Sequence, residues 1–239
     1  MRFVSTIGVL GGMGPEATNR LCALLTACTR ARADQEHLPV ITFNNSLIPE
    51  RVGAIEGETL SPVPEIIRTA RVLEEAGAQL LVMPCNLAHY FFDEIQRALR
   101  VPVINMIEET VSFACAAYPN LRQVGLLAST PTIKTGLYEK SFAVMGRVVL
   151  SPAATEQESK VMEAIYGKRG IKSGHRDEPL SLLLEAAHNL AACGAELLIA
   201  GCTEVSLVLE QKHLSLPLID PMEVVARVAV ERAGGQTRD

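Results

Sequence analysis

Short runs of apolar and β-branched residues alternate along the chain with longer stretches in which apolar residues recur at helical spacing, as in 65–76 and 179–192. The short runs predict eight strands: Ser5–Leu10, Val40–Phe43, Leu80–Met83, Val103–Asn105, Gln123–Ala128, Arg147–Leu150, Leu197–Ala200 and Leu218–Ile219. Strands that alternate with helices usually pair in parallel and are covered by helices. The pattern therefore predicts an α/β fold built on parallel sheets.

The second half of this pattern repeats the first at an offset of 117 residues. The matching segments are GAQLLVMPCN at 77–86 with GAELLIAGCT at 194–203, and TIGVLGG at 6–12 with QVGLLAS at 123–129. A third pair, VPVINMIEE from Val101 and LPLIDPMEV from Leu216, matches with a two-residue slip. Self-similarity of this kind indicates a duplicated unit.

The duplication predicts two similar α/β domains related by a pseudo-twofold axis. We expect the first to comprise residues 1–112 with about 217–239, and the second residues 113–216. Cys85 and Cys202 occupy equivalent positions, each at the end of a predicted strand. Because ligands of open parallel sheets bind at the carboxyl ends of strands, both thiols are expected in one cleft between the domains, on opposite sides of a small molecule.

Two opposed acid/base groups suit inversion of a carbon centre, since one thiolate can remove a proton while the other thiol delivers one. The residues after each cysteine, 86–99 and 203–212, have a helical pattern. A helix start lowers a thiol pKa, so we expect both values near neutrality. Asn86, Thr203, Ser129 and Thr130 stand at strand ends, where they are candidate donors to an enolate-like charge.

Several motifs resemble the aspartate/glutamate racemase family, and most closely its cofactor-independent aspartate racemases. They are GGMGP near the start, NNSLIPER at 44–51, PCNLAH with Cys85, INMIEET at 104–110, GCTE with Cys202 and PLIDPM at 217–222. The resemblance covers essentially the whole chain. It implies a two-domain α/β enzyme, usually dimeric, that needs neither metal nor pyridoxal phosphate and uses two cysteines as proton donor and acceptor.

The resemblance also assigns roles to residues of this sequence. Cys85 and Cys202 become the catalytic thiols, Asn86 and Thr203 hold the α-carboxylate, and Arg51 pairs with the side-chain carboxylate. The substrate lysine falls at Lys172, with Lys168 as a competitor. Further candidates for substrate contact are Met13, Leu87, Ala88, Ser129, Thr130 and Glu204.

Some of these candidates have open alternatives. Glu204 is a substrate contact, a cap for its own helix or a partner that orients Cys202. Two positions depart from the family: Leu87 follows PCN where a threonine is usual, and Glu50 stands where an aspartate usually precedes the arginine. The first change removes a hydroxyl beside Cys85, so the motif alone does not identify the substrate.

Composition argues against several other classes. The net charge is −5, aromatic residues make up 4% and Trp is absent, so a nucleic-acid partner is not expected. The six cysteines are scattered without a C-x-x-C pair, which argues against a disulfide scaffold or a thiol-rich metal site. His89 lies four residues after Cys85, yet two ligands are too few for zinc.

Two motifs near the start have competing interpretations. GMGPEA at 12–17 formally fits a dinucleotide fingerprint, but Asn44 and Asn45 stand where an acidic residue would hold the ribose. A tight turn carrying Met13, with Pro15 opening a helix, is preferred. The first apolar run is too short for a signal peptide, and no run is long enough to span a membrane, so a cytoplasmic location is expected.

The sequence thus predicts a cofactor-independent racemase of a small acidic amino acid, aspartate foremost, acting as a homodimer without membrane or metal. Within the same superfamily, a glutamate racemase, a broad-specificity amino-acid racemase and a maleate-isomerase-like enzyme stay open. Outside it, a duplicated scaffold that only binds a small carboxylate is the alternative.

Overall fold

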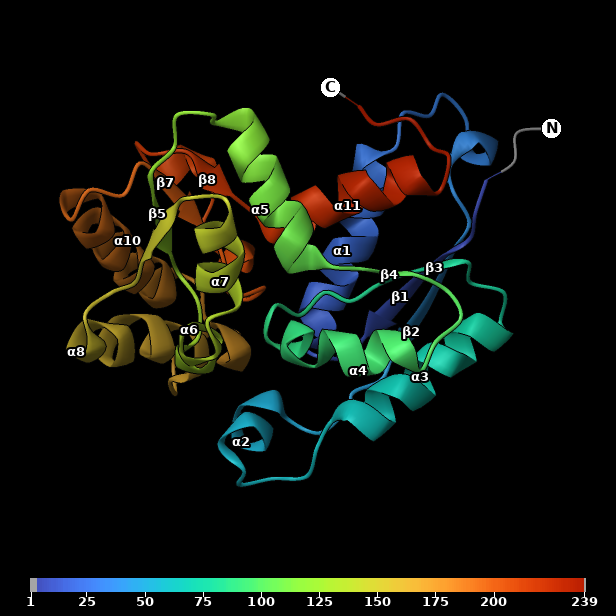
Figure 1. The fold of residues 1–239 in the computed structure, drawn as a ribbon, viewed down its shortest axis with the longest axis horizontal. Coiled ribbons are helices and arrows are strands. Elements are labelled where there is room, and N and C mark those ends of the chain that lie inside the picture. Colours follow the sequence, from blue (N-terminus) through green and yellow to red (C-terminus); the bar gives the residue numbers. More distant parts are fainter. Residues whose placement is uncertain (1–3, 239) are drawn as a thin grey trace. The chain divides into compact units, whose positions relative to one another are not determined.

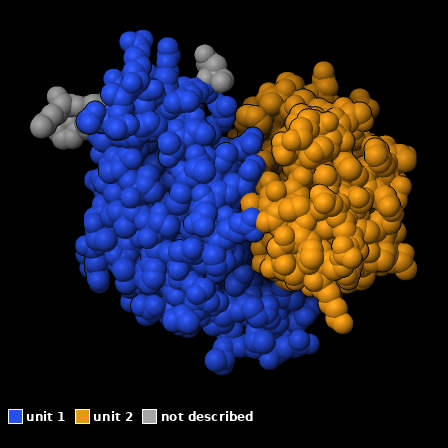
Figure 2. Space-filling model, turned by 180° about the vertical axis from the view of Figure 1, so that it is seen from behind, with its two compact units in different colours: residues 1–109, 222–239 blue, residues 110–221 orange. Residues whose placement is uncertain are grey.

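A computed structural model describes residues 4–238 and contains two four-stranded parallel sheets (Figure 1). The chain divides into two compact units, one of residues 1–109 with 222–239 and one of residues 110–221 (Figure 2). The predicted α/β fold with two similar parallel sheets is confirmed, and every predicted strand is present.

In the first unit the strand order is β2-β1-β3-β4. The strands are β1 (Ile7–Gly11), β2 (Val40–Asn44), β3 (Leu80–Val82) and β4 (Val103–Ile104). Helices α1 (Pro15–Cys28) and α11 (Pro221–Arg232) share one hydrophobic cluster with one face of the sheet and lie side by side in Figure 1. Helices α3 (Val63–Glu75) and α4 (Phe92–Arg97) share a second cluster with the other face.

In the second unit the order is β6-β5-β7-β8, which is the same topology. The strands are β5 (Gln123–Leu126), β6 (Val148–Leu150), β7 (Leu197–Ile199) and β8 (Leu218–Ile219). Helix α5 (Met106–Ala117) leads from the first unit into the second, which also contains α6 (Thr130–Thr135), α7 (Leu137–Val144), α8 (Ala154–Glu156), the π-helix η3 (Gln157–Met162), α9 (Glu163–Tyr166), the 3₁₀ turn η4 (Ile171–Ser173) and α10 (Asp177–Ala192). Helices α9 and α10 pack with η3 on one face of this sheet.

The 117-residue repeat extends to individual contacts. Gly8 pairs with Leu81 in the first sheet, and Gly125 pairs with Leu198 in the second. A methyl group added at Gly8 would lie 2.5 Å from Leu81 Cδ2, and one added at Gly125 would lie 2.6 Å from Leu198 Cδ2. Both glycines are therefore required by the same close approach of a leucine, which supports duplication of one packed unit.

The predicted helices after the two cysteines are only partly present. Residues after Cys85 form a 3₁₀ helix, η2 (Leu87–Phe91), before α4 begins. Residues after Cys202 form two short 3₁₀ turns, η5 (Val205–Leu207) and η6 (Gln211–His213), and no α-helix. The apolar residues of 203–212 are packed against the unit's core instead of forming a helical stripe, so the helical prediction for this segment is wrong.

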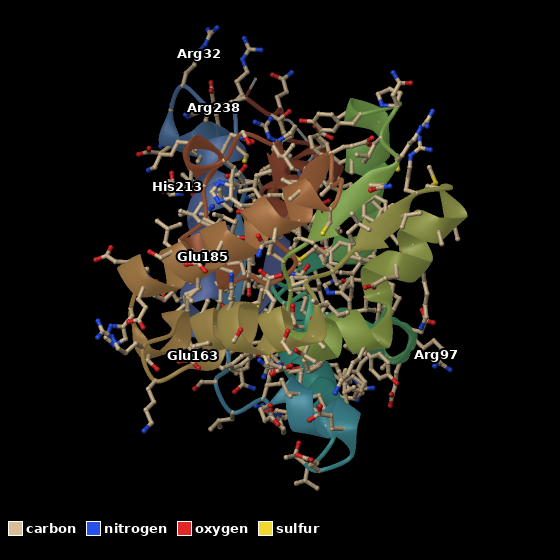
Figure 3. The ribbon with its side chains drawn as sticks, turned by 90° about the vertical axis from the view of Figure 1, so that its left-hand side faces the viewer. Arg32, Arg97, Glu163, Glu185, His213 and Arg238 are labelled. Atoms are coloured by element: carbon tan, nitrogen blue, oxygen red, sulfur yellow. The ribbon has the colours of Figure 1, made fainter. Side chains whose placement is uncertain are left out.

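Charged side chains such as Arg32 and Arg97 point away from the ribbon (Figure 3). Between residues 4 and 238 there is no helix both long and apolar enough to cross a membrane.

Candidate active site

Cys85 lies just beyond the carboxyl end of β3 and is 6% exposed. The side chain belongs to the hydrophobic cluster that also contains Met13, Leu87 and Ala88. Four predicted site residues of the first unit therefore belong to one hydrophobic cluster. Leu87 is also buried, with 7% of its surface exposed. The residue that departs from the family pattern therefore contributes apolar packing beside the thiol.

His89 holds the backbone of the cysteine. The backbone N–H of Met106 donates to Nε2 at 3.1 Å, which makes that nitrogen an acceptor. The other nitrogen, Nδ1, consequently carries the proton and donates it to the carbonyl of Cys85 at 2.8 Å. Burial lowers the pKa of His89, so the ring stays neutral in this role.

His89, four residues after Cys85, thus connects the segment beyond β3 to the start of α5. Both ring nitrogens of His89 are engaged by the backbone, and the ring stacks on Phe92 at 5.9 Å between centroids. Among residues 4–238, no group of three or more His, Cys, Asp or Glu side chains is arranged to hold a metal ion.

Cys202 lies beyond the carboxyl end of β7, and a carboxylate engages its thiol. Sγ donates to Oε2 of Glu204 at 3.0 Å, while Oε1 of Glu204 accepts a hydrogen bond and an ion pair from Nζ of Lys172. Glu204 is 6% exposed. The three side chains form one connected chain of thiol, carboxylate and ammonium within the second unit.

This arrangement sets the protonation of the two acids. Burial raises the pKa of the Cys202 thiol well above its usual value, and the negative charge of Glu204 raises it further. Burial also works to raise the pKa of Glu204, but the charge and hydrogen bond of Lys172 outweigh it and hold that pKa below its usual value. The predicted near-neutral pKa is therefore wrong for Cys202, which has a carboxylate beside it where a helix start was expected.

Glu204 accepts from the thiol of Cys202, which fits one of the three roles considered for it, that of a partner to this cysteine. Its side chain does not cap the following 3₁₀ turn. It also accepts from Oγ1 of Thr203 at 3.2 Å, so the hydroxyl of the buried Thr203 points to the same carboxylate as the thiol.

The two candidate lysines differ in position. Lys172 lies in η4, where Nζ pairs with Glu204 and stands 5.5 Å from the ring centroid of Tyr166. Its side chain is 32% exposed. Lys168 lies in the exposed turn before η4. Contact with the Cys202 group thus distinguishes Lys172 from Lys168.

Arg51 is the first residue of α2 (Arg51–Glu56), and its guanidinium bridges two backbone segments. Nη1 donates to the carbonyl of Pro49 at 3.1 Å and Nη2 to the carbonyl of Met13 at 3.0 Å. The carboxylate of Glu50 caps the same helix through the N–H groups of Val52 and Gly53. The longer side chain at position 50 therefore serves the helix start, and Arg51 ties that start to the β1–α1 turn.

The β1–α1 turn leaves no room beside Gly12. Gly12 has a φ of 104°, and a Cβ there would lie 2.0 Å from the carbonyl oxygen of Asn45. Pro15 opens α1, as predicted. Met13 is 2% exposed, so it reaches Arg51 through its backbone carbonyl while its side chain packs in the core.

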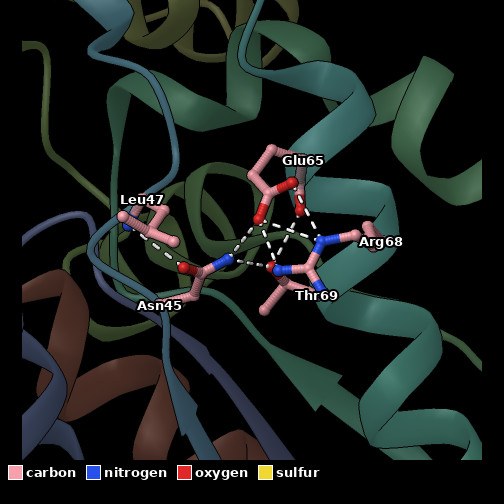
Figure 4. A network of polar contacts seen from close by, with 5 residues as sticks. All are labelled: Asn45, Leu47, Glu65, Arg68 and Thr69. Atoms are coloured by element: carbon pink, nitrogen blue, oxygen red, sulfur yellow. Dashed lines mark hydrogen bonds and ion pairs between the residues drawn. The ribbon is translucent and has the colours of Figure 1, made fainter.

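A polar network anchors the segment that leads to Arg51 (Figure 4). Nδ2 of Asn45 donates to Glu65 and to Thr69, each at 2.7 Å, and Oδ1 accepts from the N–H of Leu47 at 3.0 Å. Arg68 grips Glu65 in a bidentate pair. The hydrogen bond from Arg68 lowers the pKa of Glu65 to about 2, so the carboxylate stays charged at any ordinary pH.

Asn86 and Ala88 flank Leu87 and are 2% and 0% exposed, respectively. In the second unit, Ser129 is buried with Oγ 3.0 Å from Oγ1 of Thr132. Thr130 donates its hydroxyl proton to Glu158 at 2.6 Å, and its backbone N–H lies 3.2 Å from the sulfur of Met162. The Thr130 hydroxyl is thus committed to η3.

No sequence motif points to the residues that hold the end of β5. Gln157, Glu158 and Met162 all contact the 128–130 turn. They lie in a polar stretch that has no motif and no clear periodicity, and the π-helix that presents them together cannot be recognised from spacing.

Comparisons with known proteins agree with this architecture. The family described as Asp/Glu/Hydantoin racemase matches residues 10–229. The chain is 26% identical over 230 residues to the broad specificity amino-acid racemase RacX of Bacillus subtilis, covering 94% of this chain and 96% of that one. It is 30% identical over 143 residues to a glutamate racemase of Corynebacterium glutamicum, covering 59% of this chain and 50% of that one.

A solved structure extends the similarity. The aspartate racemase of Picrophilus torridus superimposes with a TM-score of 0.87 at 25% identity, over 98% of this chain and 96% of that one.

Proposed function

This chain belongs to the Asp/Glu/Hydantoin racemase family, and we propose that it racemises a small acidic amino acid, aspartate foremost, by proton transfer between Cys85 and Cys202. The observation that carries the proposal is the hydrogen bond from the Cys202 thiol to Glu204, because it holds one cysteine protonated and ready to act as an acid. Cys85, at the equivalent position of the repeat, is the matching base.

The proposed reaction transfers two protons and leaves no net change. The thiolate of Cys85 takes the α-proton, and the thiol of Cys202 gives its proton to the opposite face of the same carbon. Cys202 is then the thiolate and Cys85 the thiol, which is the state required for the reverse direction. Asn86 and Thr203 are proposed to hold the α-carboxylate, where developing negative charge needs donors, with the Thr203 hydroxyl turning from Glu204 to the substrate as it binds.

The side-chain carboxylate of the substrate is proposed to meet Arg51 and Lys172. Arg51 supports this role because its guanidinium is fixed by two backbone carbonyls and its Nε, which is buried, has no partner among residues 4–238. Lys172 supports it because its side chain is 32% exposed, so the ammonium group that pairs with Glu204 is also open to a ligand. Both cations suit an acidic substrate better than a neutral one.

Apolar packing beside Cys85 favours a second candidate, a racemase of broader specificity. Leu87 puts a buried aliphatic side chain where the family usually has a hydroxyl, and RacX, with 26% identity, is described as a broad specificity enzyme. The experiment below also tests two further alternatives, a glutamate racemase and a maleate-isomerase-like enzyme. If no substrate is turned over, the remaining alternative is a protein that binds a small carboxylate without activity.

The test is incubation of the purified protein in D₂O with L-Asp, D-Asp, L-Glu, D-Glu, L-Ala and maleate, followed by chiral separation and mass spectrometry. We expect formation of the opposite enantiomer of aspartate with one deuterium at the α-carbon. Turnover of alanine as well would favour the broader specificity. The absence of deuterium from every amino acid would contradict the proposal.

Four variants assign the bases. Cys85→Ser and Cys202→Ser should each abolish racemisation while aspartate still binds. Cys115→Ser and Cys193→Ser are the matched controls, because they remove thiols elsewhere in the chain and should keep full activity. Unchanged activity in either of the first two variants would exclude the two-thiol mechanism.

The family resemblance also supports a homodimer acting in the cytoplasm. Sedimentation of the purified protein checks the first point, and fractionation of cells that produce it checks the second.

A further inference from the structure

Gln157 is a buried amide with one atom left without a partner. It is the first residue of η3 and is 4% exposed. Nε2 donates to the carbonyl of Ala128 at 2.8 Å and lies 3.3 Å from Oγ1 of Thr130. Oε1 is also buried, and no donor within the described range of residues 4–238 reaches it.

The orientation of this amide follows from its neighbours. The carbonyl of Ala128 can only accept a hydrogen bond, so the atom 2.8 Å away must be the NH₂ group. Thr130 gives its single hydroxyl proton to Glu158 at 2.6 Å, so it too is an acceptor toward Gln157. If the amide were flipped, its carbonyl oxygen would face two other acceptors, the carbonyl of Ala128 and Oγ1 of Thr130. The atom without a partner is therefore the carbonyl oxygen.

A buried acceptor without a donor is uncommon in folded proteins, because the group has lost its water and gained nothing in exchange. It also stands in a π-helical turn, an irregularity that is frequent at functional sites. Both observations indicate an acceptor that a donor from outside the chain completes.

The position of Gln157 connects it to Cys202. β5 and β7 are paired neighbours, with Leu126 opposite Ile199. Beyond that pair, a methyl group added at Gly201 would lie 3.0 Å from the Cβ of Ala128, the residue whose carbonyl Gln157 holds. Gly201 directly precedes Cys202. Gln157 thus holds the end of β5, and this end contacts the end of β7, which carries Cys202.

We propose that Oε1 of Gln157 accepts a hydrogen bond from the α-ammonium group of the amino acid substrate, an inference that rests on the proposed function. At neutral pH the ammonium is the only donor in aspartate or glutamate, since both carboxylates only accept. A neutral amide also completes the bond without adding charge beside the Cys202 group. Gln157 is then the residue that distinguishes an amino acid from the corresponding dicarboxylate.

The experiment compares L-aspartate with succinate, which has the same two carboxylates and no ammonium group. Dissociation constants are measured by calorimetry in the full-length Cys85→Ser protein, so that bound aspartate is not turned over. Gln157→Met should weaken aspartate about tenfold to a hundredfold, the range for a hydrogen bond to a charged group, and leave succinate unchanged.

Glu158→Gln is the matched control, because it loosens the same turn through Thr130 and leaves the Gln157 acceptor in place. It should leave the ratio of the two affinities unchanged. Equal weakening of both ligands by Gln157→Met, or no change in either, would overturn the inference while racemisation by the wild type still stands. A wild type that neither binds nor racemises any acidic amino acid would overturn both proposals.

Discussion

The thiol of Cys202 donates a hydrogen bond to the carboxylate of Glu204, with 3.0 Å between Sγ and Oε2. A carboxylate that accepts from a thiol stabilises the protonated sulfur and opposes the thiolate. Lys172 compensates the charge of Glu204 from its other oxygen, so the carboxylate stays ionised although it is buried. The acid of the proposed pair is therefore prepared by Glu204, the last residue of the GCTE motif, and by Lys172, which lies outside that motif.

Replacing Glu204 with glutamine should make Cys202 more reactive. The substitution removes the negative charge that raises the thiol pKa and leaves the positive charge of Lys172 nearby, so the pKa of Cys202 falls. Thiolate concentration below the pKa rises tenfold for each unit of that fall, and we expect alkylation by iodoacetamide at pH 8 to accelerate at least about tenfold. Site-resolved mass spectrometry across a pH series gives the rate and its midpoint.

Cys28 is the internal control for that measurement, since burial raises its pKa and Glu204 is not among the groups that act on it. Its alkylation should be the same in both proteins. An unchanged midpoint at Cys202 would show that Glu204 does not govern its protonation.

Removing the positive charge at position 172 should destabilise the protein in a pH-dependent way. In the wild type the folded-state pKa of Glu204 is lowered, so its stabilising contribution is present at neutral pH and is lost as pH falls through that lowered value. In Lys172→Met the opposing charge is gone and burial, the largest influence on Glu204, is countered only by the hydrogen bonds that its carboxylate accepts, so the pKa rises. The buried carboxylate then costs about 1–3 kcal/mol at pH 7, less than for a fully buried pair because Lys172 is partly exposed, and acidification recovers stability.

Urea unfolding at pH 7.5 and pH 5.5 checks the sign. Lys168→Met removes an equal charge from the exposed turn nearby, and its stability should follow the wild type at both pH values. A Lys172→Met protein that gains no stability relative to the wild type between pH 7.5 and pH 5.5 would contradict the assignment of Lys172 to Glu204.

The fold could be predicted because it depends on patterns that are local in sequence. Buried strands appear as short apolar runs. The correspondence of Gly8 with Gly125, and of Cys85 with Cys202, follows from the repeat of one packed unit. The site was predictable only where a motif names the residue. The contact of Glu204 with Cys202 was one of three alternatives, because residue spacing does not give the direction of a side chain.

Other features depended on tertiary contacts that the sequence does not signal. The segment after Cys202 looked helical because its apolar residues fall at helical intervals, yet core packing draws them into two 3₁₀ turns. Gln157 stands in a stretch whose π-helical turn is set by contacts with a strand end 29 residues away. The spacing of His89 from Cys85 is visible in the sequence, but its tautomer follows from the N–H of Met106.

Alanine at Gly8 or at Gly125 should destabilise the protein through the same clash. In each case the new methyl group meets a leucine Cδ2 at 2.5 or 2.6 Å, inside a packed core. We expect each variant to lose about 1–3 kcal/mol of unfolding free energy, measured by urea denaturation. Leu81→Val should partly rescue Gly8→Ala and leave Gly125→Ala unaffected, while Leu198→Val should do the reverse. Cross-rescue, or no rescue by the paired change, would contradict the equivalence of the two contacts.

Arg51→Lys should weaken substrate binding without slowing proton transfer. Lysine keeps the charge but cannot bridge the carbonyls of Met13 and Pro49, which are held by two separate nitrogens of the guanidinium fork. Losing part of a charged hydrogen-bond pair corresponds to about a tenfold to hundredfold rise in KM for aspartate. The kcat should change little, because a side-chain carboxylate is bound equally before and during the proton transfer.

Arg71→Lys on the exposed surface of α3 is the matched control and should leave both constants unchanged. Steady-state racemisation measured by circular dichroism separates the two constants. A fall in kcat with constant KM would assign Arg51 to the chemical step instead of to substrate binding.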